Sequence, residues 1–398
     1  MARRTHRLRE PDVARKGVPG AGRPEPLESL VPVGACGVWN TPGQAHWEGS
    51  SSTGAGAPFR LGDGGMGGFA GQRVCGGEHG QFRGFDSATS DLLLTLGKGG
   101  DSMRALVTGG AGFIGGYVVE RFARRGIEPV VLDLVWPEGL EATPLYYPGD
   151  VRDPEAVAAA MEGCSVVVHL AGILGTDLTM DSPVETVENN LIGTLRVLEE
   201  ARRQRVRVVL INVGNDWDNP YTITKQAAVR FGLMYGREFG LPVTVVRAMN
   251  GYGPRQKADE TKKLVPTLIC AALRGEPLPV YGDGEQEVDL VYVEDVAEVL
   301  VRAALVPEPF RGQLDAATGQ TIRVNEVAQR IRELVNPGVP VAYLPMRRGE
   351  PPRSRTVGDP EAVARHLGYV PQTPLDEGLR RTVEWYRVRS RAAAQVAV

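Results

Sequence analysis

The chain of 398 residues is long enough for one large or two ordinary domains, and its 42% hydrophobic content can bury a substantial core. A formal net charge of −3 provides no basic field that would attract nucleic acid or an anionic membrane. No apolar run reaches the ~20 residues that span a bilayer, so we expect a small-molecule partner, no nucleic acid and no membrane.

Residues 1–102 differ in composition from the rest. The stretch LGDGGMGGFAGQRVCGGEHG at 61–80 combines many glycines with few aliphatic residues, and no helical or strand periodicity appears up to residue 90. Such a stretch cannot bury enough apolar surface to offset chain entropy, which predicts a disordered extension. The basic start MARRTHRLRE has no apolar segment behind it, which argues against an export signal. Met103 directly precedes the first expected strand, and we hypothesise that the natural polypeptide starts there; N-terminal sequencing of native protein would test this.

From Met103 onward, apolar runs alternate with amphipathic helical patterns, which is typical of parallel strands covered by helices. We expect strands at 105–108, 129–133, 145–147, 166–170, 206–212 and 243–247, with helices between most of them. This predicts an α/β fold with a Rossmann-type, doubly wound parallel sheet in residues 103–250. Residues 251–390 mix short strands and helices, and we expect them to form mainly a smaller mixed α/β substrate-binding region, partly interleaved with the sheet. Residues 391–398 would form a tail.

A glycine-rich turn follows the first expected strand. Gly109, Gly112 and Gly115 have GxxGxxG spacing, which permits a tight turn, a close approach to a pyrophosphate and tight packing of helix on strand. Free N–H groups at the following helix N-terminus would face the phosphates. Asp133 ends the second strand, where a carboxylate can bind the adenosine ribose and repel a 2′-phosphate, so NAD is favoured over NADP. The alternatives are an ordinary tight turn and a vestigial Rossmann fold.

Several phrases of the chain resemble the extended short-chain dehydrogenase/reductase family, also called the NAD-dependent epimerase/dehydratase family. They are TGGAGFIG at 108–115, GD at 149–150, HLAG at 169–172, YTITK at 221–225, RAMNGYGPRQ at 247–256, VYGDGEQ at 280–286 and RRGEP at 347–351. The resemblance extends from residue 103 to about residue 387. It implies NAD as cofactor, a nucleotide-diphosphate sugar as substrate and a homodimer formed through helices that include 221–239. The implied cofactor-binding residues are Gly109, Gly112, Phe113, Ile114, Gly115, Asp133, Asp150, Val151, Leu170, Ala171, Gly172, Tyr221 and Lys225.

Tyr221 and Lys225 are four residues apart on an expected helix, so both side chains lie on one face. An unperturbed tyrosine has a pKa of about 10, and a neighbouring ammonium or an oxidised nicotinamide favours the phenolate. YxxxK alone is common and also describes a surface tyrosine above a solvated lysine. The resemblance makes Tyr221 the catalytic acid/base, and it makes Lys225 both the charge that lowers the tyrosine pKa and a ligand of the nicotinamide ribose.

The chain departs from the family where a catalytic serine or threonine usually ends the fifth strand. Val213 stands near that place, and the loop before Tyr221 is short. We name Asn212 as the candidate catalytic residue that holds the substrate oxygen, with Asn215, Thr176 and Thr222 as alternatives. The asparagines would otherwise serve only to form turns.

On the substrate side, the resemblance makes Asn250 and Arg255 candidate ligands of the diphosphate, and Arg347 a candidate ligand of a phosphate or a ribose oxygen. Val288 precedes Asp289 where relatives usually have an arginine, so one phosphate contact is lost or comes from Lys262, Lys263 or Arg255. The alternatives are solvated surface lysines and an asparagine turn at Asn250.

The reaction that fits these residues is oxidation and re-reduction of the sugar at C4, which makes a nucleotide-sugar 4-epimerase our first choice. A dehydratase or decarboxylase shares the first step but needs further groups, and the acids Asp216 and Asp218 are displaced from the usual dehydratase positions with no glutamate beside them. A non-catalytic NAD-binding regulator is the alternative from another class.

The four cysteines Cys36, Cys75, Cys164 and Cys270 lack CxxC spacing and predict reduced thiols in a cytoplasmic protein. The five histidines lack ligand spacing and predict no metal site.

Truncation to residues 103–398 should leave the fold, NAD binding and turnover unchanged, because the removed part has no periodic apolar face that could dock on a core. Melting temperature and activity of the two forms check this expectation. A large loss of either in the truncated form would refute it.

Overall fold

The computed structural model describes residues 103–137, 139–258 and 261–396, with the side chains of 393–396 left out. The predicted disordered extension lies outside the described residues.

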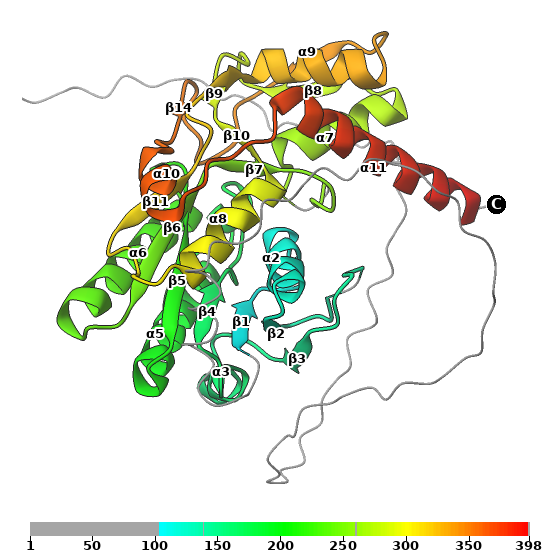
Figure 1. The fold of residues 1–398 in the computed structure, drawn as a ribbon. Coiled ribbons are helices and arrows are strands. Elements are labelled where there is room, and N and C mark those ends of the chain that lie inside the picture. Colours follow the sequence, from blue (N-terminus) through cyan, green and yellow to red (C-terminus); the bar gives the residue numbers. More distant parts are fainter. Residues whose placement is uncertain (1–102, 138, 259–260, 397–398) are drawn as a thin grey trace, which may run out of the picture. The chain divides into compact units, whose positions relative to one another are not determined.

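A seven-stranded parallel sheet forms the centre of the described part (Figure 1). Its spatial order is β11-β6-β5-β4-β1-β2-β3, and every neighbouring pair runs parallel. The bounds are β1 Arg104–Thr108, β2 Glu128–Asp133, β3 Leu145–Pro148, β4 Val166–His169, β5 Arg207–Val213, β6 Val243–Ala248 and β11 Gln313–Ala316. The order reverses between β1 and β4, so the predicted doubly wound sheet is confirmed. Ligands of such sheets bind at the carboxyl ends of the strands, beside this reversal.

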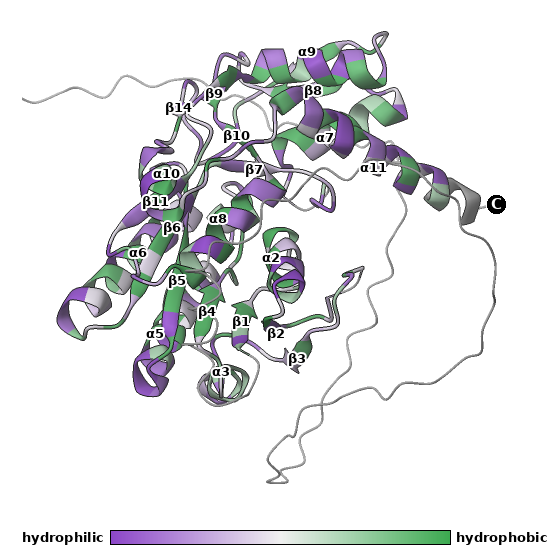
Figure 2. Ribbon diagram, in the orientation of Figure 1, coloured by the Kyte–Doolittle hydropathy of each residue, from purple (hydrophilic) through white to green (hydrophobic). Residues whose placement is uncertain are grey.

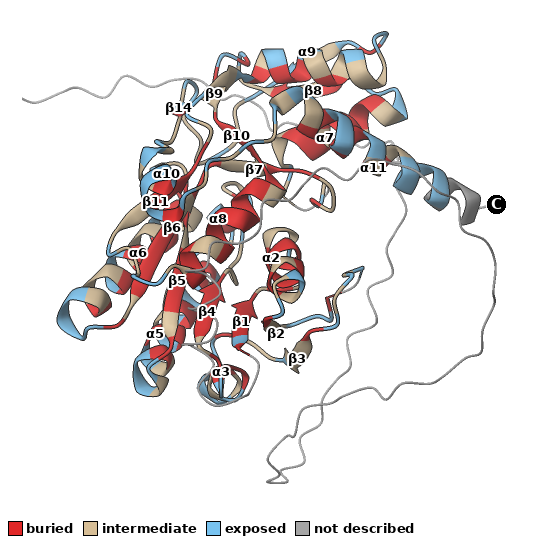
Figure 3. Ribbon diagram, viewed as in Figure 1, coloured by how far each residue is buried: buried red, intermediate tan, exposed pale blue. Residues whose placement is uncertain are grey.

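The inner strands β1, β2, β4, β5 and β6 are largely hydrophobic and buried, because helices cover both faces of the sheet (Figures 2 and 3). One face packs against α2 (Phe113–Arg124), α8 (Val293–Leu305) and α10 (Glu361–Leu367), around Phe122 and Leu300. The other packs against α3 (Pro154–Met161), α5 (Gly193–Gln204) and α6 (Pro220–Glu238), around Leu198 and Leu210. Between β4 and α5 lie η1 (Leu178–Met180), α4 (Pro183–Val187) and the π-helical η2 (Glu188–Ile192).

The seventh strand, β11, was not among the expected ones. Its sequence QLDA is four residues long and half polar, so it carries no strand periodicity. It pairs with β6, with Gln313 beside Val245, which brings a segment from the second half of the chain into the central sheet.

A second core lies among α7 (Leu264–Arg274), α9 (Val324–Val335) and α11 (Leu375–Val396), around Leu268, Ile331 and Leu379. The short strands of this region pair as β7 (Asn250–Tyr252) with β10 (Leu290–Tyr292) and β8 (Leu278–Tyr281) with β13 (Val341–Leu344). A third small sheet joins β9 (Glu287–Val288) to β12 (Ile322–Arg323) and β14 (Arg355–Thr356). This is the mixed α/β arrangement expected beside a Rossmann sheet.

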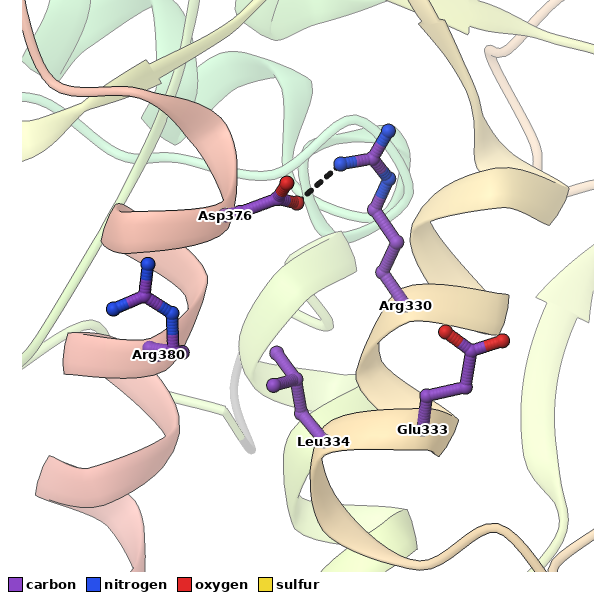
Figure 4. A pocket seen from close by; sticks show the side chains of 5 residues that line it. All are labelled: Arg330, Glu333, Leu334, Asp376 and Arg380. Carbon is purple, nitrogen blue, oxygen red and sulfur yellow. Dashed lines mark hydrogen bonds and ion pairs between the residues drawn. The ribbon is translucent and has the colours of Figure 1, made fainter.

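A cavity of about 530 Å³ opens between α9 and α11 (Figure 4). Arg330 and Asp376 form an ion pair across it, and Glu333, Leu334 and Arg380 complete the lining. None of the predicted site residues lines this cavity.

Within the described ranges, no helix is both long and apolar enough to cross a membrane. Cys164 is buried, and neither Cys164 nor Cys270 forms a disulfide within the described part of the chain.

Candidate active site

The glycine turn lies between β1 and α2, with Gly112 as the N-cap residue of α2. Gly109 has φ +71°, a left-handed conformation that favours glycine. A Cβ atom on Gly109 would lie 2.7 Å from the backbone nitrogen of Ala171, and one on Gly115 would lie 2.1 Å from the carbonyl oxygen of Gly109. No side chain fits at either position, so the turn lies directly against the segment that follows β4.

Parallel register brings the other predicted cofactor residues to the same edge of the sheet. Thr108, the last residue of β1, lies beside Leu132 and His169. Asp133 and the segment 170–172 therefore flank the glycine turn on either side. The Asp133 carboxylate accepts a hydrogen bond of 2.9 Å from the backbone N–H of Ala111 in the turn.

Asp150 follows β3 at this edge, and Arg152 holds its carboxylate. The Arg152 side chain donates hydrogen bonds of 2.9 and 2.6 Å to one oxygen, and its backbone N–H donates one of 2.8 Å to the other. These bonds lower the pKa of Asp150. Val151 is buried, and its side chain fills the space beside Gly193.

Replacing Asp133 by asparagine should narrow the preference for NAD over NADP, because the amide keeps a hydrogen-bonding oxygen and loses the charge that repels a 2′-phosphate. Losing ~1.4 kcal/mol of repulsion would change the affinity ratio about tenfold. Asp133→Ala should also weaken NAD binding itself. Dissociation constants of both cofactors measure these effects, and an unchanged ratio in both variants would show that another residue reads the ribose.

His169 is fully buried under this edge and bridges β1 to α5. The hydroxyl of Thr194 donates to the carbonyl of Asn190 at 2.6 Å, so its oxygen must accept from His169 Nε2 at 2.9 Å. Nδ1 is then the acceptor for the hydroxyl of Thr108 at 2.7 Å. Burial, assisted by the charge of Lys225, lowers the pKa of His169 to about 3. The ring is therefore neutral, and it is a structural residue that the sequence analysis did not identify.

Tyr221 lies in the first turn of α6, the helix that the YTITK phrase predicts. The side chain of Asn219 caps this helix by accepting from the N–H of Thr222 at 2.9 Å, and its amide donates to the carbonyl of Gly349 at 3.0 Å. The cap therefore joins the start of α6 to the loop that carries the RRGEP phrase.

Of the two predicted catalytic side chains, Lys225 is buried and Tyr221 is half-buried. Burial raises the pKa of Tyr221 to about 12 and lowers the pKa of Lys225 to about 8. The resemblance implies that Lys225 and an oxidised nicotinamide lower the pKa of this tyrosine, and this stays a prediction for the NAD-bound protein, because burial alone accounts for both shifts here. Lys225 is 4% exposed, and its ammonium has no hydrogen-bond or ion-pair partner among the described residues. A buried, unpaired ammonium is costly unless a ligand supplies its partner.

The residues proposed to replace the usual catalytic serine or threonine hydroxyl already form hydrogen bonds within the protein. Asn212 donates to Gln313 at 2.8 Å and accepts from the N–H of Val213 at 2.9 Å, so both ends of its amide are engaged. The hydroxyl of Thr222 donates to Asn215 at 2.8 Å at the start of α6. A catalytic role of Asn212 stays a prediction, and it requires the contact with Gln313 to open.

Arg347 enters the site from the loop after β13. Its guanidinium donates to Glu350 at 3.1 and 3.0 Å and to the carbonyl oxygen of Lys262 at 2.8 Å. Glu350 also accepts from the hydroxyl of Thr176, in the segment after β4. Glu350 was not predicted, although it stands in the same RRGEP phrase as Arg347.

A cavity of about 390 Å³ joins the short loop after β5 to the RRGEP loop. Its lining residues are Asp216, Trp217, Asp218, Gly349, Glu350 and Pro351. The two acids displaced from the usual dehydratase positions therefore lie near Glu350.

The predicted diphosphate ligands Asn250 and Arg255 make their contacts with other parts of the protein. Asn250 belongs to β7 and donates to the carbonyl oxygen of Asp289 at 3.3 Å. Arg255 donates to Glu120 of α2 at 2.9 Å and lies 4.6 Å from the centroid of the Tyr117 ring. Arg255 thus forms a partly buried ion pair with α2, and binding a phosphate would require that pair to break.

Comparison with known proteins identifies the family. The model described as the NAD dependent epimerase/dehydratase family matches residues 105–215 and 216–312. The chain belongs to this family. A dTDP-glucose 4,6-dehydratase of Xanthomonas campestris is 30% identical over 330 residues, covering 71% of this chain and 92% of the relative. A UDP-N-acetyl-alpha-D-glucosaminuronate decarboxylase of Bacillus cytotoxicus is 28% identical, covering 71% of this chain and 98% of the relative.

Solved structures of similar proteins include two UDP-glucose 4-epimerases. The Thermotoga maritima enzyme with UDP-glucose is 29% identical with a TM-score of 0.68, covering 72% of this chain and 99% of that one. The Thermus thermophilus enzyme in complex with NAD is 31% identical with a TM-score of 0.64, covering 72% of this chain and 99% of that one. The chain is therefore similar to epimerases, dehydratases and decarboxylases that act on nucleotide sugars.

The family is NAD-dependent, and the residues of this site fit the cofactor. The glycine turn has no room for side chains, the carboxylate of Asp133 lies beside it, and the ammonium of Lys225 is buried without a described partner. These three features provide a pyrophosphate cradle, a ribose ligand and a cation that a second ribose can satisfy.

Proposed function

We propose that the protein is an NAD-dependent nucleotide-sugar 4-epimerase. The observation that supports the proposal is the geometry of α6, where Lys225 is buried and Tyr221, one turn earlier on the same face of the helix, is half-buried. Bound NAD would accept a hydride from the sugar C4 and return it.

The chain's own residues then perform the proton chemistry. Tyr221 removes the proton of the C4 hydroxyl and later returns one to the same oxygen, and Lys225 stabilises the phenolate while it holds a ribose hydroxyl. The 4-keto sugar must rotate between the two steps to present its other face. Asp133 and the glycine turn hold the cofactor through both steps.

Dehydration or decarboxylation would need a further acid or base near C5 and C6. Glu350 already accepts hydrogen bonds from Arg347 and Thr176, so this carboxylate serves to position the arginine. This favours epimerisation over the dehydratase and decarboxylase chemistry of several relatives.

Incubation of the purified protein with a panel of nucleotide sugars in D₂O tests the proposal. A 4-epimerase yields a product of unchanged mass with no deuterium on carbon, because the hydride leaves and returns internally. Loss of water with deuterium at C5 would indicate a dehydratase, and loss of carbon dioxide a decarboxylase. NAD binding without turnover of any nucleotide sugar would favour the non-catalytic regulator.

We also propose that the protein is a homodimer formed through α6. Exposed apolar side chains gather on α6 and the neighbouring α4 and η2, among them Val184 at 71% and Ile223 at 55% exposure, with Val187, Ile192 and Phe231. A contiguous apolar surface of this kind is typical of an interface. Light scattering should give a dimer mass for the parent and a monomer mass for Val184→Arg; a parent that is only monomeric would refute the proposal. We also propose a cytoplasmic location, where a buried thiol such as that of Cys164 stays reduced.

A further inference from the structure

The RRGEP loop, residues 347–351, is tied by Arg348 to the segment that follows β4. The Arg348 guanidinium donates to Asp177 at 2.7 Å and to the two carboxylate oxygens of Asp181 at 2.8 and 2.7 Å. These two carboxylates stand at the start and the end of η1, 171 and 167 positions earlier in the chain. A guanidinium paired with two carboxylates is fixed in direction as well as in place. The proposed mechanism assigns no role to this arginine.

Two further contacts hold the same loop in place. Gly349 has φ +72°, and a Cβ atom there would lie 2.9 Å from Cβ of Asn219 and 3.5 Å from Sδ of Met180. Glu350 accepts a hydrogen bond from the hydroxyl of Thr176. The backbone of the loop therefore lies directly against both η1 and the start of α6.

The loop also forms one wall of the cavity of about 390 Å³, whose other lining residues, 216–218, come shortly before Tyr221 in the chain. For this cavity to open further, the wall has to move, and the contacts of Arg348 oppose that movement. The side chains of Arg348 and Asp181 are nevertheless 55% and 69% exposed, so water and salt can replace their contact. Such ion pairs hold the loop closed and still let it open within a turnover.

The proposed reaction needs a closed wall for a chemical reason. Its first step moves a hydride from C4 to bound NAD and the C4 hydroxyl proton to Tyr221, which leaves a ketone. No covalent bond holds this ketone, and it must turn its other face before the hydride returns. A ketone that escapes carries the oxidation away, and the enzyme is left with NADH and no sugar to reduce. Closure that lasts through both steps prevents this loss.

We propose that Arg348 is a positioning residue, which holds residues 347–351 closed over the oxidised sugar until the hydride has returned. The arginine acts through the loop and does not contact the sugar itself. This inference rests on the proposed function, because only a reaction with a keto intermediate needs such retention.

The fate of the ketone during turnover tests the inference. The protein with bound NAD is incubated with its preferred nucleotide sugar and removed by filtration, and borodeuteride then marks any released ketone with deuterium at C4. With Arg348→Met, the fraction of turnovers that end in released ketone should rise roughly fivefold, a factor typical of an exposed ion pair. Fluorescent NADH should accumulate on the protein, and the KM for the sugar should rise while the Kd for NAD stays that of the parent.

Two sets of variants identify the contact responsible. Asp177→Asn combined with Asp181→Asn should reproduce the leak, and Arg348→Lys should recover part of the retention. Arg353→Met is the matched control, because Arg353 follows the same loop and pairs with Asp283 at 3.2 Å instead of with η1. This control should release no more ketone than the parent.

Amide hydrogen exchange gives a second measurement that needs no turnover. In the cofactor-free protein, residues 347–351 should exchange faster in Arg348→Met than in the parent or in Arg353→Met. Added salt should speed this exchange in the parent and have little effect on Arg348→Met, because it screens a contact that the variant lacks.

The outcomes separate this inference from the proposed function. A parent that epimerises its sugar and an Arg348→Met enzyme that releases no more ketone would overturn the role of Arg348 and leave the proposed function standing. A leak from Arg348→Met that the asparagine double variant does not share would also overturn it, because the arginine would then act without η1. A parent that forms neither ketone nor epimer from any nucleotide sugar would overturn both.

Discussion

Replacing Tyr221 by phenylalanine should give a folded, NAD-binding protein that interconverts its nucleotide sugar at least ~100-fold more slowly. The substitution removes only the phenolic oxygen, and loss of a general acid/base typically costs ~10²–10⁴-fold in rate. The ring stays in place to pack, so the protein should keep its melting temperature within the effect of ~1 kcal/mol that one lost hydroxyl produces. Initial rates with the preferred nucleotide sugar and an NAD titration provide the two measurements.

Tyr235→Phe is the matched control, because it removes a hydroxyl from the same helix. That hydroxyl donates to Glu199 on α5 and takes no part in the proposed chemistry. The control should therefore lose a little stability and no rate. A Tyr221→Phe enzyme that turns over near the parent rate would place the base elsewhere, and the family mechanism would then not apply to this short loop.

Replacing Lys225 by methionine should stabilise the cofactor-free protein and still abolish most of its activity. Burial lowers the pKa of Lys225 to about 8, whereas the unfolded chain keeps a lysine pKa near 10.4. At pH 7 both states are protonated and the folded state bears the whole cost of the buried charge. That cost is ~3 kcal/mol from the difference between the two pKa values, and methionine removes it.

The pH dependence of this gain identifies its cause. Between pH 8 and about 10.4 the unfolded chain binds a proton that the folded protein does not, so the stability of the parent rises with pH through this window. The advantage of Lys225→Met should therefore be largest at pH 7 and shrink toward pH 10. Melting curves of both cofactor-free proteins at several pH values measure it. A variant that is less stable than the parent at pH 7 would contradict the role of burial.

The same variant should lose activity and NAD affinity together, because the ammonium both stabilises the phenolate and binds a ribose hydroxyl. Activity should fall by ~10²-fold or more, as for the loss of the base itself. Turnover at near the parent rate would show that Lys225 has neither role.

The local patterns of the sequence predicted most of the central sheet. The strands of a parallel sheet are buried on both faces and read as continuous apolar runs, so six of them were recognisable from their residues alone. The glycine turn was also predictable, because the requirement for a small residue at Gly109 and Gly115 arises within a few positions of the chain. The four-residue spacing of Tyr221 and Lys225 fixes their common face for the same reason.

The remaining features depend on contacts between distant segments. The strand β11 has no periodicity of its own and forms because β6 offers an open edge. Arg255 pairs with Glu120 across 135 positions of sequence, which no phrase around either residue indicates. Likewise, Asn212 finds its partner in Gln313 of that same unpredicted strand.

The sequence by itself determined which residues the proposed chemistry would use, namely the glycine turn, Asp133, and the pair Tyr221 and Lys225. Only the tertiary structure decided the electrostatics of these groups. The pKa of Tyr221 depends on how much protein covers its hydroxyl, and covering Lys225 lowers its pKa where spacing alone predicted an ordinary cation. Packing also brought the Nζ atom of Lys263 to 6.0 Å from the centroid of the Tyr221 ring. Burial and long-range contact are properties of the folded chain, and a linear pattern of residue types does not contain them.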